Sequence, residues 1–136
     1  MVSRRKAEEQ EEADRGHFAY DGLNRVMHEK ARLGILTALR TRSEWILFGD
    51  LKELCSLTDG NLSRHLTVLH DAGLVSVRKG HEGSRPQTWA RLTSKGRKEF
   101  DAYLEELHRV IQDANVRYPV TPDATGGDTP PGLRPA

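Results

Sequence analysis

The chain has one cysteine, no long apolar run and almost no net charge. With Cys55 as the single thiol, no disulfide can form within the chain, and a reducing, cytoplasmic compartment is expected. No stretch approaches the roughly 20 apolar residues that span a bilayer, and the first residues lack the charged-then-apolar pattern of a secretion signal. We therefore expect neither a secreted protein nor one with a membrane as its partner.

Composition and length divide the 136 residues into three segments. Residues 1–15 are rich in charge and are predicted to be disordered or to form a solvated helix. Residues 16–117 carry the apolar periodicity of one small domain with a single modest core. Residues 118–136 are rich in proline, glycine and threonine, and are predicted to be a disordered tail.

The net charge of +1 is uninformative, but the charges are unevenly distributed. Residues 58–98 contain eight cations and three anions, a local charge of +5. Residues 99–136 contain three cations and seven anions, a local charge of −4. A positive field confined to the middle of the chain is what a phosphate-binding surface needs.

Residues 48–73 carry the pattern of two helices joined by a tight turn. Thr58 is a favourable N-cap for the second helix, and Gly73 supplies the left-handed residue that ends it. Short connections of this kind make two helices cross steeply. Helical spacing places three leucines of the second helix on one stripe, which we expect to face the core: Leu62, Leu66 and Leu69.

The opposite face of this second helix is polar. Arginine can pair bidentately with guanine and asparagine with adenine, so Arg64 is the predicted main base-reading residue, beside Asn61. The alternative for Arg64 is a phosphate contact or an ion pair with Asp71. Any surface helix can show a solvated face, but here a turn precedes the helix and a basic hairpin follows it. The residues predicted to contact DNA from this helix are Thr58, Asp59, Gly60, Asn61, Ser63, Arg64 and Thr67.

The hairpin is predicted from β-prone residues 74–77, glycines at positions 80 and 83, and a returning strand over residues 87–93. Pro86 keeps Arg85 extended. Residues 45–47 are predicted to add a third strand. The order of elements is that of a helix-turn-helix with a wing, whose basic tip reaches phosphates or the minor groove. The predicted DNA-contacting residues of the wing are Arg78, Lys79, His81 and Arg85.

Two further helices are expected, over residues 26–40 and 94–116, the second capped by Thr93 or Ser94. The apolar residues of the second recur every three to four positions, as in a helix that packs on another helix. Another apolar cluster lies at residues 18–23, and a core this small cannot obviously cover both. We therefore predict a homodimer with an interface formed by Phe18, Tyr20, Leu23, Phe100, Tyr103, Leu104, Leu107, Val110 and Ile111.

Five segments together resemble prokaryotic one-domain winged-helix transcriptional regulators of the MarR/ArsR-like superfamily. They are HEKARLGILTAL (28–39), FGDLKEL (48–54), LTDGNLSRHLTVL (57–69), AGLV (72–75) and RPQTWARLTSKGR (85–97). The resemblance covers about residues 18–111 and implies a mostly α fold with a small β-hairpin wing (α+β). It also implies a dimer formed through the N- and C-terminal helices that binds a near-palindromic operator.

Other chemistry is less well supported by the sequence. Six histidines occur without a second thiol or a histidine pair one helical turn apart, so no metal or other cofactor is predicted. Glu105 and His108 share a helix face, but two ligands do not complete a tetrahedral site. A lone cysteine late in a short helix, as Cys55 is, serves more often as a packing residue than as a redox switch. His28 is expected to cap a helix or to form a hydrogen bond at its start. No nucleophile, base and orienting group recur in a recognisable arrangement, so we do not predict an enzyme.

Two functions from different classes remain. The first is a sequence-specific regulator, acting as a repressor, that binds double-stranded DNA as a homodimer. The alternative is a winged helix used as a protein-protein interaction module. Docking helices usually expose an apolar anchor, and Asn61, Ser63 and Arg64 supply none, so DNA is favoured. A cleft between the DNA-binding core and the dimer helices is a place for a small-molecule effector of unknown identity.

Overall fold

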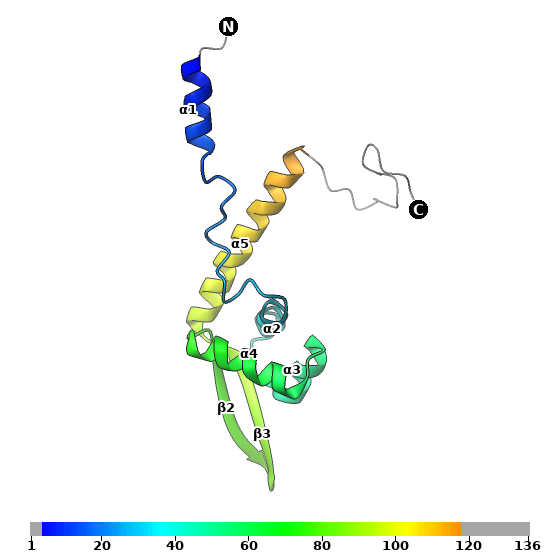
Figure 1. Ribbon diagram of the computed structural model, residues 1–136. Helices are drawn as coiled ribbons and strands as arrows, with labels where there is room; N and C mark the ends of the chain where they lie inside the picture. Colours follow the sequence, from blue (N-terminus) through cyan, green and yellow to red (C-terminus); the bar gives the residue numbers. More distant parts are fainter. Residues whose placement is uncertain (1–3, 118–136) are drawn as a thin grey trace, which may run out of the picture.

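The computed structural model describes residues 4–117, so the predicted tail at 118–136 lies outside the described residues. Figure 1 shows the hairpin projecting from one side of the body while α5 extends from the other. None of the described helices is long and apolar enough to cross a membrane. The elements are α1 (Arg4–Asp14), α2 (Lys30–Thr41), β1 (Ile46–Leu47), α3 (Phe48–Cys55), α4 (Asp59–Asp71), β2 (Val75–Glu82), β3 (Arg85–Leu92) and α5 (Ser94–Arg117).

The charged extension forms α1, which stands apart from the other helices (Figure 1). Arg4 and Arg5 form ion pairs one turn along the helix, with Glu8 at 3.6 Å and Glu9 at 3.7 Å. Exposed pairs of this kind stabilise a helix by only about 0.3–0.5 kcal/mol each. No residue of α1 belongs to the core among the described residues.

Helix α2 begins at Lys30, four residues later than the helix predicted over residues 26–40. Glu29 is its N-cap, because the carboxylate accepts hydrogen bonds from the amides of Ala31 and Arg32 at 3.1 and 2.9 Å. A carboxylate in this position satisfies amides that have no partner within the helix. His28 therefore does not cap α2, and its Nδ1 instead lies 2.6 Å from the hydroxyl of Tyr103 on α5.

Helices α3 and α4 form the predicted helix-turn-helix. Ser56, in the left-handed conformation with φ 51°, ends α3. Thr58 is confirmed as the N-cap of α4, because its hydroxyl accepts a 3.2 Å hydrogen bond from the amide of Asn61. Gly73 is left-handed as predicted, with φ 77°. The stripe predicted to face the core is buried: Leu62, Leu66 and Leu69.

The three strands form one antiparallel sheet in the order β1-β3-β2. The predicted third strand is present, although it starts at Ile46, which lies opposite Ala90 on β3. Strands β2 and β3 pair along their whole length, from Val75 opposite Leu92 to the pair at the turn, Glu82 and Arg85. The wing is thus a regular hairpin of two eight-residue strands.

The core corrects part of the dimer prediction. Phe100 and Tyr103 are 0% and 1% exposed within a single chain, so they are not available to a partner subunit. The prediction was wrong for these two because the start of α5 packs on the domain itself, leaving only its later turns uncovered. The buried apolar core comprises Met27, Ile35, Leu36, Leu39, Ile46, Leu51, Leu62, Leu66, Leu69, Leu74, Val75, Ala90, Phe100 and Tyr103.

Candidate nucleic-acid interface

The outward side of α4 presents polar side chains next to one another. Nη2 of Arg64 donates a 3.2 Å hydrogen bond to Oδ1 of Asn61, so the two candidate base-reading groups lie together. Asp71, the alternative partner for Arg64, lies beside His70 instead, with Oδ1 3.7 Å from Nδ1. All seven residues predicted to contact DNA from this helix are exposed: Thr58, Asp59, Gly60, Asn61, Ser63, Arg64 and Thr67.

The first turn of α4 is tied to α3. Nζ of Lys52 lies 2.9 Å from Oδ1 of Asp59, and this hydrogen bond raises the pKa of the lysine. The pair neutralises a carboxylate that would repel phosphates on this surface. Gly60 follows with open space where a Cβ would stand. Lys52 was not predicted as part of the site, because its partner comes from the next helix.

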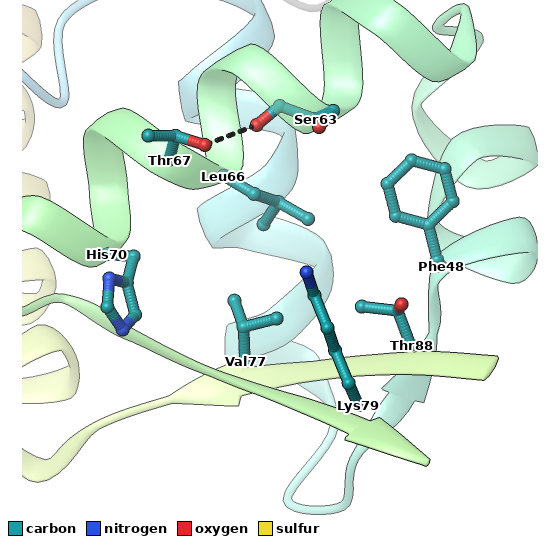
Figure 2. A pocket seen from close by; sticks show the side chains of 8 residues that line it. All are labelled: Phe48, Ser63, Leu66, Thr67, His70, Val77, Lys79 and Thr88. Atoms are coloured by element: carbon teal, nitrogen blue, oxygen red, sulfur yellow. Dashed lines mark hydrogen bonds between the residues drawn. The ribbon is translucent and has the colours of Figure 1, made fainter. Parts of the chain in front are cut away.

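A groove of about 690 Å³ separates α4 from the hairpin. Figure 2 shows the side chain of Lys79 rising from β2 toward α4, with its amine between the helix and the sheet. The hydroxyl of Thr67 donates a 3.0 Å hydrogen bond to the carbonyl oxygen of Ser63 on the helix side. The groove was not predicted as a unit, because residues from four separate elements line it: Phe48, Ser63, Leu66, Thr67, His70, Val77, Lys79 and Thr88.

The predicted wing cations lie on two different faces of the sheet. Lys79, opposite Thr88, shares the face of Val77 that looks toward α4. Because strand residues alternate, His81 falls on this same face and Arg78 on the reverse. Arg85 lies at the turn, whereas Arg78 lies opposite Trp89 in the middle of the strand, not at the tip where it was expected.

Behind the outward face, His65 anchors α4 to α2. It is 9% exposed, and its Nδ1 lies 3.4 Å from Nη1 of Arg32 and 3.7 Å from Oε2 of Glu29. Hydrogen bonds from the amides of Arg32 and Ala31, with the nearby charges of His65 and Arg32, lower the pKa of Glu29. His65 was not predicted as part of the site, although it lies on the inner stripe one turn after Leu62.

The surface left for a second subunit is smaller than predicted. Leu23 and Leu107 pack against the core, and Val110 is half-buried. Tyr20 is half-buried and uses its hydroxyl in a 2.6 Å hydrogen bond to Asp113. The predicted interface residues that stay exposed are Phe18 (68%), Leu104 (37%) and Ile111 (50%).

Metal and thiol chemistry find little support in the part of the chain that the structure describes. Within residues 4–117, no three His, Cys, Asp or Glu side chains gather closely enough to hold a metal ion. Glu105 and His108 therefore have no third ligand there. Burial raises the pKa of the Cys55 thiol, which lowers the fraction of reactive thiolate at neutral pH.

A family model described as a winged helix DNA-binding domain matches residues 31–111. The chain belongs to this family. Among its relatives, an uncharacterized protein of Methanocaldococcus jannaschii is 37% identical over 83 residues, which cover 61% of this chain and 89% of the relative. The HTH-type transcriptional regulator YdgJ of Bacillus subtilis, itself uncharacterized, is 31% identical over 110 residues, or 73% of this chain and 66% of YdgJ.

Solved structures share the winged-helix fold. A transcriptional regulator homologue from Pyrococcus horikoshii superposes with a TM-score of 0.61 at 30% identity, covering 79% of this chain and 98% of that one. A MarR-family regulator from Silicibacter pomeroyi has a TM-score of 0.51 at 23% identity, covering 81% and 75%, which shows the fold alone. The predicted fold and the resemblance to winged-helix regulators are thus confirmed, and the relatives whose names state a class are transcriptional regulators.

Proposed function

We propose that this winged-helix protein is a sequence-specific regulator that binds double-stranded DNA through α4 and the wing. The observation that carries the proposal is the outward pairing of Arg64 with Asn61 next to the Lys79 groove. Arginine can donate two hydrogen bonds to guanine, and asparagine can donate to N7 of adenine while accepting from its N6 amino group, in the major groove. In the proposed complex, α4 lies in the major groove and the hairpin tip reaches the adjacent minor groove. A chromosomal target implies a cytoplasmic location.

The groove between α4 and the sheet suits a sugar-phosphate backbone. In B-DNA a backbone separates each major groove from the neighbouring minor groove, so it must pass between a helix in one and a hairpin in the other. The amine of Lys79 and the hydroxyls of Ser63 and Thr88 line that path. Such contacts fix the register of the protein on the duplex without selecting a sequence.

We further propose that the protein acts as a homodimer on a near-palindromic operator. Leu104 and Ile111 on α5, with Phe18, leave apolar surface uncovered in the single chain, and a two-fold mate is the usual way to cover such a patch. The two copies of Arg64 would then read half-sites about one helical turn, ~34 Å, apart. A dimer over a promoter blocks access to the DNA, so the proposed action is repression.

A second cleft, of about 610 Å³, lies between residues 21–27 and α5, where the sequence suggested room for an effector. Four carboxylates line it against the one guanidinium of Arg109: Asp21, Glu99, Glu105 and Glu106. If a small molecule regulates the protein from this cleft, a cation complements the lining better than an anion.

The alternative, a protein-protein module, lacks support on α4. The exposed large apolar residues of the described chain are Phe18, Leu54, Leu104 and Ile111, and none lies on the outward face of α4. A docking helix generally needs apolar anchors at helical spacing.

The experiment selects duplexes from a random pool with the wild-type protein and compares variants on the selected and random DNA. Arg64→Ala should lose preference for the selected duplex by about 1–3 kcal/mol per contacted base pair, while circular dichroism shows the fold intact. Arg5→Ala, on exposed α1, makes the same charge change and should keep the preference. If no duplex is enriched, or if Arg64→Ala keeps the wild-type ratio of selected to random affinity, the proposal is wrong.

A further inference from the structure

The sheet has a second face, which α4 does not cover. Alternation along the paired strands puts Ser76 opposite Arg91 on this face, and Arg78 opposite Trp89. The first turns of α5 adjoin its base, where Arg97 and Lys98 line the same cavity as Ser76 and Arg91. The cations along this face and its base are called here the outer basic strip: Arg78, Arg85, Arg91, Arg97 and Lys98.

Two tryptophan rings lie along the strip, and one of them stacks on a cation. The guanidinium of Arg91 lies 4.7 Å from the centre of the Trp45 ring, a stacking that holds the cation while leaving its edge free to donate. The Trp89 ring lies over Gly80, where a Cβ would come within 3.1 Å of it. Cations held in place on a flat surface lose less side-chain entropy when they bind an anion.

The cavity at the base of the strip has a volume of about 670 Å³ and is lined by hydroxyl groups between the cations. The one carboxylate that lines this cavity, Asp101, forms an ion pair with Arg40, whose Nε lies 2.8 Å from Oδ1. Within residues 4–117, neither Arg97 nor Lys98 has a carboxylate partner in an ion pair. The hydroxyls belong to Ser43, Ser76, Thr93 and Ser94.

The placing of these cations works against helix stability. Helix α5 has no acidic residue in its first turn, where Lys95 and Arg97 lie instead, and Lys98 follows directly. Cations near a helix N-terminus oppose the helix dipole, whereas anions there are favourable. An unfavourable arrangement of this kind is expected where a surface serves binding, with an external anion completing it.

We propose that the outer basic strip binds the phosphate backbone of the DNA that flanks the operator, beyond the wing. The inference rests on the proposed function, because the strip starts at Arg85 on the hairpin turn and continues from there to α5. The minor groove is about 6 Å wide and has a sugar-phosphate backbone on each side. A hairpin that enters it therefore lies between two backbones. One backbone passes between Lys79 and α4, and the other faces Arg78 on the outer side of the sheet.

Contact with the base of the strip requires the flanking duplex to curve toward the protein. A strand of eight residues spans about 26 Å at roughly 3.3 Å per residue, so Arg97 and Lys98 lie well beyond a minor-groove contact at the tip. DNA deforms in this way when added phosphate contacts compensate the bending. The strip thus extends the footprint by phosphate contacts that read no bases.

The test uses a duplex selected by the wild-type protein, in two lengths. The short form ends at the selected sequence, and the long form adds about ten base pairs, one helical turn, at each end. Wild-type protein should bind the long form more tightly. The double variant Arg97→Ala with Lys98→Ala should bind both duplexes with the affinity that wild type has for the short duplex. On the long form, the slope of log affinity against log salt should fall by about 0.9 for each phosphate that the variant no longer neutralises.

The matched control is Arg4→Ala with Arg5→Ala, which removes two cations from α1 and should leave both affinities unchanged. The Arg97/Lys98 variant should have a melting temperature no lower than that of wild type, because it removes cations that oppose the helix dipole.

The inference is overturned if the affinity of wild type does not increase on the longer duplex, if the variant keeps that increase, or if the variant binds both duplexes more weakly by the same factor. Binding of polyglutamate that depends on Arg97 and Lys98, without a length effect on DNA, would mark the strip as a surface for an acidic protein and also overturn it. A wild-type protein that enriches no duplex rejects the proposed function itself, whereas these other outcomes leave that function intact.

Discussion

The hydroxyl of Tyr20 donates a 2.6 Å hydrogen bond to Oδ2 of Asp113, joining residues 93 positions apart in the sequence. The guanidinium of Arg109 lies 5.3 Å from the centre of the same ring, and the amide of Gly22 bonds to Glu106 at 2.9 Å. These contacts fasten the segment before α2 along α5. Tyr20 therefore links two segments of the same chain and is not a free apolar group available to a partner subunit.

Tyr20→Phe should loosen the segment around residues 19–24 in a pH-dependent way. The hydrogen bond raises the pKa of Tyr20 above 10.0 and lowers the pKa of Asp113 below 3.8. A lowered carboxyl pKa gives stability that is lost as pH falls through the folded value, and a raised tyrosine pKa gives stability that is lost as pH rises through its own. Hydrogen-exchange protection should be lower in the variant between about pH 5 and 9, and the difference should shrink below the folded pKa of Asp113.

A difference between Tyr20→Phe and wild type that stayed constant down to pH 2 would contradict this role for the hydroxyl. It would point instead to a change in how the ring packs, which does not depend on the charge of Asp113. Asp113→Asn is the matched control, because it keeps the shape of the acceptor and removes its charge. It should lose the acid limb of the pH dependence.

The dimer prediction concerns the later turns of α5. Ile111→Asp places a charge in an apolar patch that the proposed two-fold mate covers, so it should convert the dimer to a species of one 15.3 kDa chain. Light scattering at micromolar concentration measures the mass. Leu54→Asp is the control, because Leu54 is equally exposed, at 52%, but lies on α3. A wild-type protein with the mass of one chain, or an Ile111→Asp protein that stays dimeric, would show that this patch is not the interface.

The sequence predicted the ends of a helix correctly where a single residue determines the local backbone conformation. Thr58 and Gly73 mark the two ends of α4, and each acts through its own side chain or its own φ angle. The start of α2 was missed because Glu29 is an unusual N-cap, recognised only once its carboxylate is seen to accept two amides. Ordinary capping preferences favour shorter side chains.

The helical periodicity of the apolar residues in α5 could not predict which of them are buried in the core and which are exposed. Phe100 and Ile111 have the same helical spacing and similar chemistry, yet one is fully buried and the other half exposed. The difference depends on where α2 and the sheet end beside α5, which is a property of the whole fold. The same reason hid the groove at Lys79, since Thr88 and Ser63 approach it from elements far apart in sequence.

The Lys79 groove should contribute affinity without sequence preference. Lys79→Ala should weaken binding to selected and random duplexes by the same factor, and should lower the salt slope by about 0.9 per subunit. Titrations at several salt concentrations measure both quantities. Lys6→Ala, on α1, makes the same charge change away from the groove and should alter neither. A Lys79→Ala protein with an unchanged salt slope, or with a changed sequence preference, would contradict the phosphate assignment.

Two glycines should respond to alanine in opposite ways. At Gly96 a Cβ would stand 1.9 Å from the carbonyl oxygen of Leu74, so Gly96→Ala must push α5 away from β2. The expected loss is about 3 kcal/mol of unfolding free energy, at the upper end of overpacking effects. At Gly60 the same Cβ meets open space, and alanine should instead raise the stability of α4 by up to about 1 kcal/mol.

Gly60→Ala also separates stability from function. The proposed DNA backbone approaches the first turn of α4 closely, and a methyl group there should weaken binding although the protein unfolds less easily. Chemical denaturation gives the stability, and titration with the selected duplex gives the affinity. Because the two effects have opposite signs, a loss of binding cannot be attributed to unfolding. A Gly60→Ala protein that binds DNA as tightly as wild type would show that this turn does not touch the duplex.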